Sequence, residues 1–124
     1  MVYFPCEIVV WHVLPALRRE LCTYLIKKKG MKTKDVAKLF SLTNAAVSQY
    51  IHKKRAKTFV FDKRFIPEIE ALADHILEVN PKEQTNEYIR GGCEICRKAK
   101  SSGMLCSLHK KDAECFEDCC ICFE

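Results

Sequence analysis

Clustered cysteines are the first feature of this sequence that could do chemistry. Seven of the nine cysteines lie between residues 93 and 122, and in a reducing cytosol thiols gathered in this way more often bind a metal than form disulfides. Cys93 and Cys96 form a CxxC pair, which on a helix places two sulfurs one turn apart on one face. Because a tail of this size cannot bury much core, a metal would also hold it together. The candidate ligands are Cys93, Cys96, Cys106, Cys119 and Cys122.

Two metal centres are compatible with this spacing, and both would use the first three thiols of the tail. A [4Fe–4S] cluster would add one thiolate from Cys119 or Cys122. A zinc site would instead add His109, which follows the third thiol at a two-residue gap. The surplus of thiols over histidines favours iron–sulfur, while Cys115 and Cys120 remain further candidates for the fourth ligand. Free or redox-switching thiols are the third possibility.

Polar side chains between residues 33 and 55 form a second set, and their chemistry suits DNA. Asn44 and Gln49 can each form paired hydrogen bonds with adenine, and the Ala45 methyl group can meet a thymine methyl. Basic residues on both sides of this set suit phosphate contacts. The candidate DNA-binding residues are Thr33, Lys34, Thr43, Asn44, Ala45, Ser48, Gln49, His52, Lys53, Lys54 and Arg55.

Positioning these side chains requires two short helices that meet at a steep angle, with the second one presented to the major groove. Thr33 is predicted to cap the first helix and Thr43 the second. Ser41 occupies the turn position that usually holds glycine, where a left-handed serine costs about 1 kcal/mol. The plainer interpretation is a helical hairpin with a solvated face, but the lack of Asp and Glu on that face favours DNA. The predicted core of the pair is Val36, Ala37, Phe40, Leu42, Val47 and Tyr50.

Helices are also predicted before this pair. Residues 6–12 are apolar on most faces, as expected of a short buried helix, and Trp11 within it is predicted to lie in the core or in a dimer seam. Pro15 should kink or break that helix. Apolar residues then recur at helical spacing from residue 17 to residue 25, and Gly30 is a suitable C-terminal stop.

The segment after the pair is predicted to form a helix over residues 67–80, and Pro81 ends it. A further helix is predicted over 82–89, followed by a hinge at Gly91-Gly92 and a short helix over 93–100. No strand is predicted, so the fold class is all-α. The apolar side of the 67–80 helix is predicted to consist of Ile69, Leu72, Ala73, Ile76 and Leu77.

Charge is distributed unevenly along the chain. Residues 1–64 hold 14 Lys and Arg against 4 Asp and Glu, a net of +10, whereas residues 65–124 hold 7 against 12, a net of −5. A basic front half points to a polyanionic partner. No uncharged apolar run approaches the length of a membrane span, and the first ten residues lack the basic start of a secretory signal. We therefore expect a cytoplasmic protein with no membrane partner.

The segment Asp-Val-Ala-Lys-Leu-Phe at 35–40, followed by Ala-Ala-Val-Ser-Gln-Tyr-Ile at 45–51, resembles the phage-repressor-type (Cro/repressor-like, XRE) helix-turn-helix. The opening Pro-Cys-Glu at 5–7, the segment at 13–18 and the tail motif at 93–97 resemble a group of small archaeal predicted regulators of that type. The resemblance implies a DNA-binding transcription regulator, and it adds to the case for an iron–sulfur cluster in the tail.

The sequence therefore predicts three parts: a helix-turn-helix domain over 1–63, a helical connector over 64–90 and a cysteine-rich metal-binding tail over 91–124. Their expected function is sequence-specific binding of double-stranded DNA, regulated by redox or iron–sulfur status. Recognition helices usually act in pairs, so we expect a homodimer with the 67–80 helix at its seam. The rival from another class is a thiol or iron–sulfur enzyme acting on nucleic acid. Because no acid–base constellation or phosphate-binding loop is evident beyond the cysteines, we expect that the chain is not an enzyme.

Overall fold

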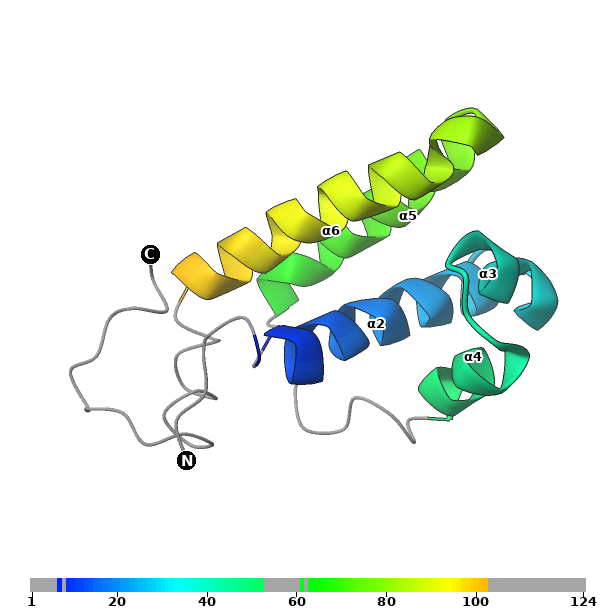
Figure 1. The fold of residues 1–124 in the computed structure, drawn as a ribbon, viewed down its shortest axis with the longest axis horizontal. Helices are drawn as coiled ribbons and strands as arrows, with labels where there is room; N and C mark the ends of the chain where they lie inside the picture. The colour runs from blue at the N-terminus through cyan, green and yellow to red at the C-terminus, as the bar shows by residue number, and fades with distance from the viewer. Residues whose placement is uncertain (1–6, 8, 53–60, 62, 103–124) are drawn as a thin grey trace.

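The computed structural model describes residues 7, 9–52, 61 and 63–102, and every regular element within these ranges is helical (Figure 1). The all-α prediction is confirmed for this part of the chain. The elements are η1 (Val9–Val13), α2 (Leu14–Lys27), α3 (Thr33–Leu39), α4 (Asn44–Ile51), η2 (Lys63–Phe65), α5 (Ile66–Glu78), η3 (Pro81–Glu83) and α6 (Gln84–Ser101).

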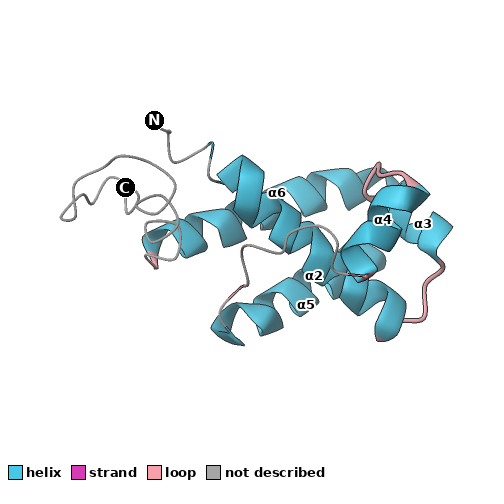
Figure 2. Cartoon of the chain, turned by 90° about the horizontal axis from the view of Figure 1, so that it is seen from below, coloured by secondary structure: helices cyan, strands magenta, loops and turns pink. Residues whose placement is uncertain are grey.

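Helices α2, α5 and α6 form the body of the molecule, and the short helices α3 and α4 pack at the end where α2 finishes (Figures 1 and 2). Helix α5 and helix α6 are antiparallel neighbours joined by the single turn η3. Helix α2 contacts all four other α-helices, so it is the central element of the fold.

One continuous hydrophobic core joins these helices. It receives Leu17, Leu21 and Leu25 from α2, at the helical spacing predicted from the sequence, and each is at most 1% exposed. Ile69 and Ile76 enter it from α5, and α3, α4 and α6 add further apolar side chains. Because the same core includes residues from Val13 to Ala99, the two short helices are held by the packing of the whole body.

The predicted hinge at Gly91-Gly92 is wrong, because α6 runs through both glycines without a break. The two glycines serve close packing instead. A Cβ on Gly91 would lie 2.3 Å from Leu72 Cδ1 on α5, and one on Gly92 would lie 3.4 Å from Leu17 Cδ2 on α2. The separate helices predicted over 82–89 and 93–100 are therefore parts of one helix, which begins after η3.

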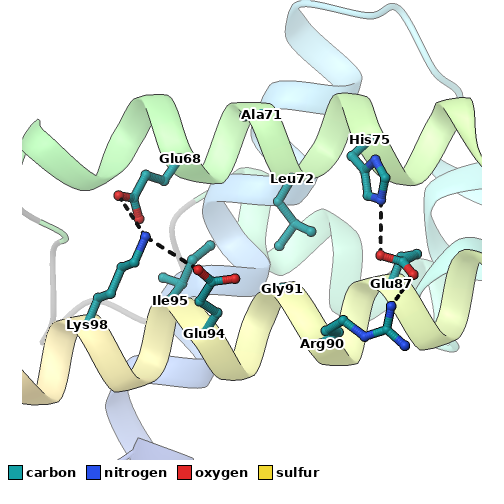
Figure 3. A pocket seen from close by; sticks show the side chains of 10 residues that line it. All are labelled: Glu68, Ala71, Leu72, His75, Glu87, Arg90, Gly91, Glu94, Ile95 and Lys98. Atoms are coloured by element: carbon teal, nitrogen blue, oxygen red, sulfur yellow. Dashed lines mark hydrogen bonds and ion pairs between the residues drawn. The ribbon is translucent and has the colours of Figure 1, made fainter.

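Charged residues line an open groove of about 390 Å³ between α5 and α6 (Figure 3). At one end Lys98 Nζ lies 3.3 Å from Glu68 and 3.6 Å from Glu94. At the other end Glu87 accepts hydrogen bonds from Arg90 at 2.8 Å and pairs with His75 at 3.0 Å. The close approach of Gly91 to Leu72 lies between these two sets, so ion pairs flank the tightest contact of the helical hairpin.

Predictions about three individual residues have different outcomes. Pro15 lies in the first turn of α2, directly after η1 ends at Val13, so the helix type changes where the kink or break was predicted. Trp11 is half-exposed and lies outside the core, so of its two predicted positions the dimer seam stays a prediction. Leu77 also faces partly outward, at 37% exposed, although the rest of the predicted apolar side of α5 is buried.

The ends of the other helices follow local signals. Helix α5 has Pro67 in its first turn as predicted, although it ends at Glu78, two residues before the predicted end. Gly30 follows α2 with a φ of +69°, the left-handed conformation expected of a C-terminal stop. Within the described ranges, no helix is both long and apolar enough to cross a membrane.

Candidate nucleic-acid interface

A tight turn between α3 and α4 fixes the relative direction of the two helices. Ser41 has a φ of +55°, which confirms the left-handed conformation expected at this position. Its N–H donates to the carbonyl of Lys38 at 3.3 Å, and the N–H of Leu42 donates to the carbonyl of Ala37 at 2.8 Å. These two bonds form a Schellman motif, which closes the C-terminus of α3 and turns the chain sharply toward α4.

Helix α4 begins as the sequence predicts. Thr43 is its N-cap, and Thr43 Oγ1 accepts a hydrogen bond from the backbone N–H of Ala46 at 3.0 Å. The corresponding prediction for α3 is wrong: Lys32 is the N-cap, without a side-chain hydrogen bond, and Thr33 is the first helical residue. Thr33 is exposed, so its hydroxyl remains on the surface, where it was predicted to contact DNA.

The predicted core of the two-helix unit is confirmed. The apolar side chains of α4 turn toward α2 and α3, and this sets which face of α4 is left for solvent. Leu42 in the turn is half-buried against the same core. The fully buried members are Val36, Ala37, Phe40, Val47 and Tyr50.

The outer face of α4 carries small or polar side chains. Asn44, Ala45, Ser48 and His52 are exposed, while Gln49 is half-buried and interacts with its own protein. Helix α4 contains no acidic residue. The structure thus brings the members of the predicted DNA-binding set from Asn44 to His52 onto one face of α4, with Gln49 at its margin, whereas Thr33 and Lys34 lie on α3.

Basic side chains lie on the adjoining surface. Lys34 is exposed in the first turn of α3, together with Asp35, and Lys32 and Lys38 are exposed on either side. The remaining basic residues of the predicted set, Lys53, Lys54 and Arg55, lie outside the described residues.

A polar clasp that the sequence did not reveal links α4 to α6. Arg18 on α2 donates from Nε to the hydroxyl of Tyr88 at 3.4 Å and also hydrogen-bonds Tyr50 on α4. Burial lowers the pKa of Arg18, but the hydrogen bonds to the two tyrosines outweigh burial and place that pKa above its ordinary value. The Tyr88 ring also packs on Phe40 of α3, with ring centroids 4.7 Å apart. Tyr88 therefore links helix α6 to the two-helix unit.

The first two predicted metal ligands lie together on α6. Cys93 is exposed and Cys96 is half-buried, and both line a shallow hollow of about 440 Å³ next to Val9 and Leu14. Burial, followed by the charge of neighbouring Cys93, raises the pKa of Cys96 to about 11. In the described part of the chain, no three Cys, His, Asp or Glu side chains form a group that could hold a metal ion.

The other proposed ligands of the metal centre lie outside the described residues. These are Cys106, Cys119 and Cys122 of the predicted set, together with the alternatives His109, Cys115 and Cys120. The structure accordingly brings together two thiols of the predicted site.

No family model, no curated protein and no solved structure matches the chain.

Proposed function

We propose that this protein binds double-stranded DNA in a sequence-specific manner and regulates transcription, with α4 as the helix that enters the major groove. The observation that carries the proposal is the outer face of α4, which exposes short polar side chains and contains no carboxylate. A helix of this kind can approach base edges without a charge penalty from the phosphates. The tight turn at Ser41 and the buried inner face hold α4 in a fixed orientation on the body.

Phosphate contacts would come from the surface beside α4. Lys32 is exposed just before α3 and Lys34 and Lys38 are exposed on it, and the first 64 residues carry a net charge of +10. Contacts of this kind position a protein on the duplex, while contacts to base edges determine the sequence it selects. Two copies of a recognition helix are needed to cover two half-sites, so we propose a homodimer as the binding species, with α5 as a candidate seam.

The proposed regulatory centre is the cysteine-rich tail. Cys93 and Cys96 share one hollow on α6, which is the arrangement required of two ligands to the same metal. A [4Fe–4S] cluster would take these two thiolates, Cys106 and one of Cys119 and Cys122, and a zinc site is the alternative. Loss or oxidation of the cluster would then change the constraint on α6.

Selection from a random duplex library tests the DNA-binding proposal. We expect the full chain to enrich one sequence motif, and Ser48→Glu to lose that enrichment because it places a carboxylate on the outer face of α4. The matched control is Asn86→Glu, which makes the same charge change at an exposed position of α6. Enrichment of the same motif by Ser48→Glu, or of none by the unaltered chain, would contradict the proposal.

Anaerobic purification with metal analysis tests the regulatory centre separately. We expect iron and acid-labile sulfide with broad visible absorption that air bleaches, and loss of both in Cys93→Ser. The control Cys22→Ala removes a thiol that is buried in the core and should keep the absorption. A colourless protein with stoichiometric zinc would support the zinc site and contradict the cluster. A protein without metal would contradict both.

A further inference from the structure

The hollow that holds the two thiols of α6 is an apolar surface with a cationic rim. Val9 and Leu14 form the apolar floor of the hollow. The exposed Arg97 and the half-exposed Lys100 form its rim. Two further apolar side chains of η1 are exposed, Val10 at 56% and Trp11 at 50%. Large apolar side chains exposed next to one another are a common mark of a surface that another segment covers.

The chain itself contains a segment whose chemistry matches this surface. Residues 112–124 include five acidic residues and no basic residue, with Phe116, Ile121 and Phe123 among them. The apolar side chains match the floor of the hollow, and the negative charge matches Arg97 and Lys100. The basic surface beside α4 belongs to the opposite end of α2, away from the end where η1 and the hollow lie (Figure 1).

The position of the hollow along the chain permits this contact. Helix α6 ends at Ser101, one residue after Lys100 on the rim of the hollow. The intervening residues 103–111 can span roughly 30 Å when extended, which exceeds the distance needed to turn back along the last turns of α6. A contact within one chain also avoids the translational entropy that a separate partner would lose on binding.

We infer that the acidic and aromatic segment 112–124 docks on the hollow formed by Val9, Leu14, Cys93, Cys96, Arg97 and Lys100. Docking brings the thiols of Cys115, Cys119, Cys120 and Cys122 to the side of α6 that carries Cys93 and Cys96. It extends the metal-site proposal by giving the tail a binding surface that exists without metal. The docking is therefore tested on reduced, chelator-treated protein. If docking fails there, the DNA-binding and metal-site proposals are still decided by their own experiments.

Alkylation of Cys93 in the full chain measures the docking. Iodoacetamide is added to the reduced protein, and the rate at Cys93 is followed by mass spectrometry of its peptide. We expect the rate to rise about tenfold in the double variant Arg97→Glu/Lys100→Glu, a factor that corresponds to about 1.4 kcal/mol of docking free energy. Because two new negative charges near Cys93 disfavour its thiolate, their direct electrostatic effect would lower the rate. An increase therefore reports exposure of the thiol.

A second variant leaves α6 unchanged, so its effect cannot come from a damaged helix end. Glu117→Lys/Asp118→Lys alters the tail alone and should raise the Cys93 rate to a similar extent. Combining both pairs of substitutions restores the charge match and should return the rate toward that of the unaltered chain. The matched control Lys28→Glu/Lys82→Glu makes the same charge change at exposed positions away from the hollow and should leave the rate unchanged.

Three results would overturn the inference. The first is an equal Cys93 rate in the unaltered chain and in both double variants. The second is an increase in the α6 variant without one in the tail variant, which would assign the hollow to another occupant. The third is protection that disappears on dilution, which would assign it to a second copy of the chain.

Discussion

Ser41 is the one non-glycine residue with a positive φ in the part of the chain that the structure describes. The N–H groups of Ser41 and Leu42 satisfy two carbonyl groups at the end of α3, so the left-handed conformation of Ser41 is required by the turn. A side chain makes this conformation unfavourable, since its Cβ lies close to the backbone. The turn that orients the proposed recognition helix therefore contains stored strain at one residue.

We expect Ser41→Gly to stabilise the protein by up to about 1 kcal/mol, because glycine adopts the left-handed conformation without strain. The entropy that glycine adds to the unfolded chain offsets part of the gain. Urea denaturation followed by circular dichroism measures the change. Gly30→Ala is the converse control: it introduces a Cβ at a φ of +69° in open space, and it should destabilise through backbone strain alone. A less stable Ser41→Gly protein would contradict this account of the turn.

At the scale of single elements, α6 shows what local sequence signals miss. Two adjacent glycines are poor helix formers, and on that basis they predict a break. The structure keeps the helix because the small residues let α6 approach α2 and α5, a contact between residues about 20 and 75 positions apart in the sequence. Helix propensity describes only neighbouring residues, so this tertiary contact could not be inferred from it.

The two glycines should respond differently to the same substitution. Gly92→Ala meets Leu17 at an ordinary contact distance and should gain up to about 1 kcal/mol from helix propensity. Gly91→Ala forces Leu72 to move from a 2.3 Å approach, and overpacking of this kind costs roughly 1–3 kcal/mol. Urea denaturation of both variants should place Gly91→Ala below Gly92→Ala in stability. Equal gains in the two variants would show that the close approach of Gly91 to Leu72 does not limit the packing of α6 on α5.

The clasp at Tyr88 makes a second prediction about α6. Tyr88→Phe keeps the ring on Phe40 but removes the hydroxyl that accepts a hydrogen bond from the half-buried Arg18. We expect a loss of about 1–2 kcal/mol in stability, because Arg18 loses one of its two tyrosine partners. Tyr24→Phe is the control, since it removes a hydroxyl that accepts no bond from Arg18 and instead donates to the surface residue Asp74 at 3.0 Å. A loss no larger than that of the control would show that the clasp contributes nothing.

The two-helix unit was the most predictable part of the fold. Its core residues, the cap at Thr43 and the left-handed Ser41 all lie within eighteen residues, so local periodicity and turn chemistry suffice to place them. The links from this unit to the rest of the chain were not predictable in the same way. Arg18 and Tyr88 are seventy positions apart, and nothing in either local sequence indicates that they meet.

At the scale of the whole molecule, the separation of charge gives the proposed DNA binding a testable salt dependence. Removing one lysine that neutralises a phosphate should reduce the slope of log affinity against log salt by about 1. We therefore expect Lys34→Ala to weaken binding to specific and random duplexes alike and to lower that slope by about 1. Lys82→Ala removes an exposed lysine near the start of α6 and should leave the slope unchanged. Fluorescence anisotropy across a salt series measures both, and equal slopes would remove Lys34 from the interface.

The metal proposal shows where sequence and structure each contribute. Spacing alone predicted that Cys93 and Cys96 share a helical face, and both do line one hollow. The floor of that hollow comes from Val9 and Leu14 at the far end of the chain, so its apolar character depends on tertiary packing. A CxxC motif therefore indicated the thiols but not the surface around them.

The unbroken course of α6 has a mechanical consequence. Tyr88 and Cys96 are eight residues apart on one helix, which places them about 12 Å apart along a rigid rod. A rotation of α6 at Cys96 would therefore also move the Tyr88 side chain relative to Phe40 and Arg18. The two ends of the helix cannot relax independently, as they could on either side of a joint. A ligand bound at Cys93 and Cys96 could therefore shift Tyr88 and the residues that pack beside α4.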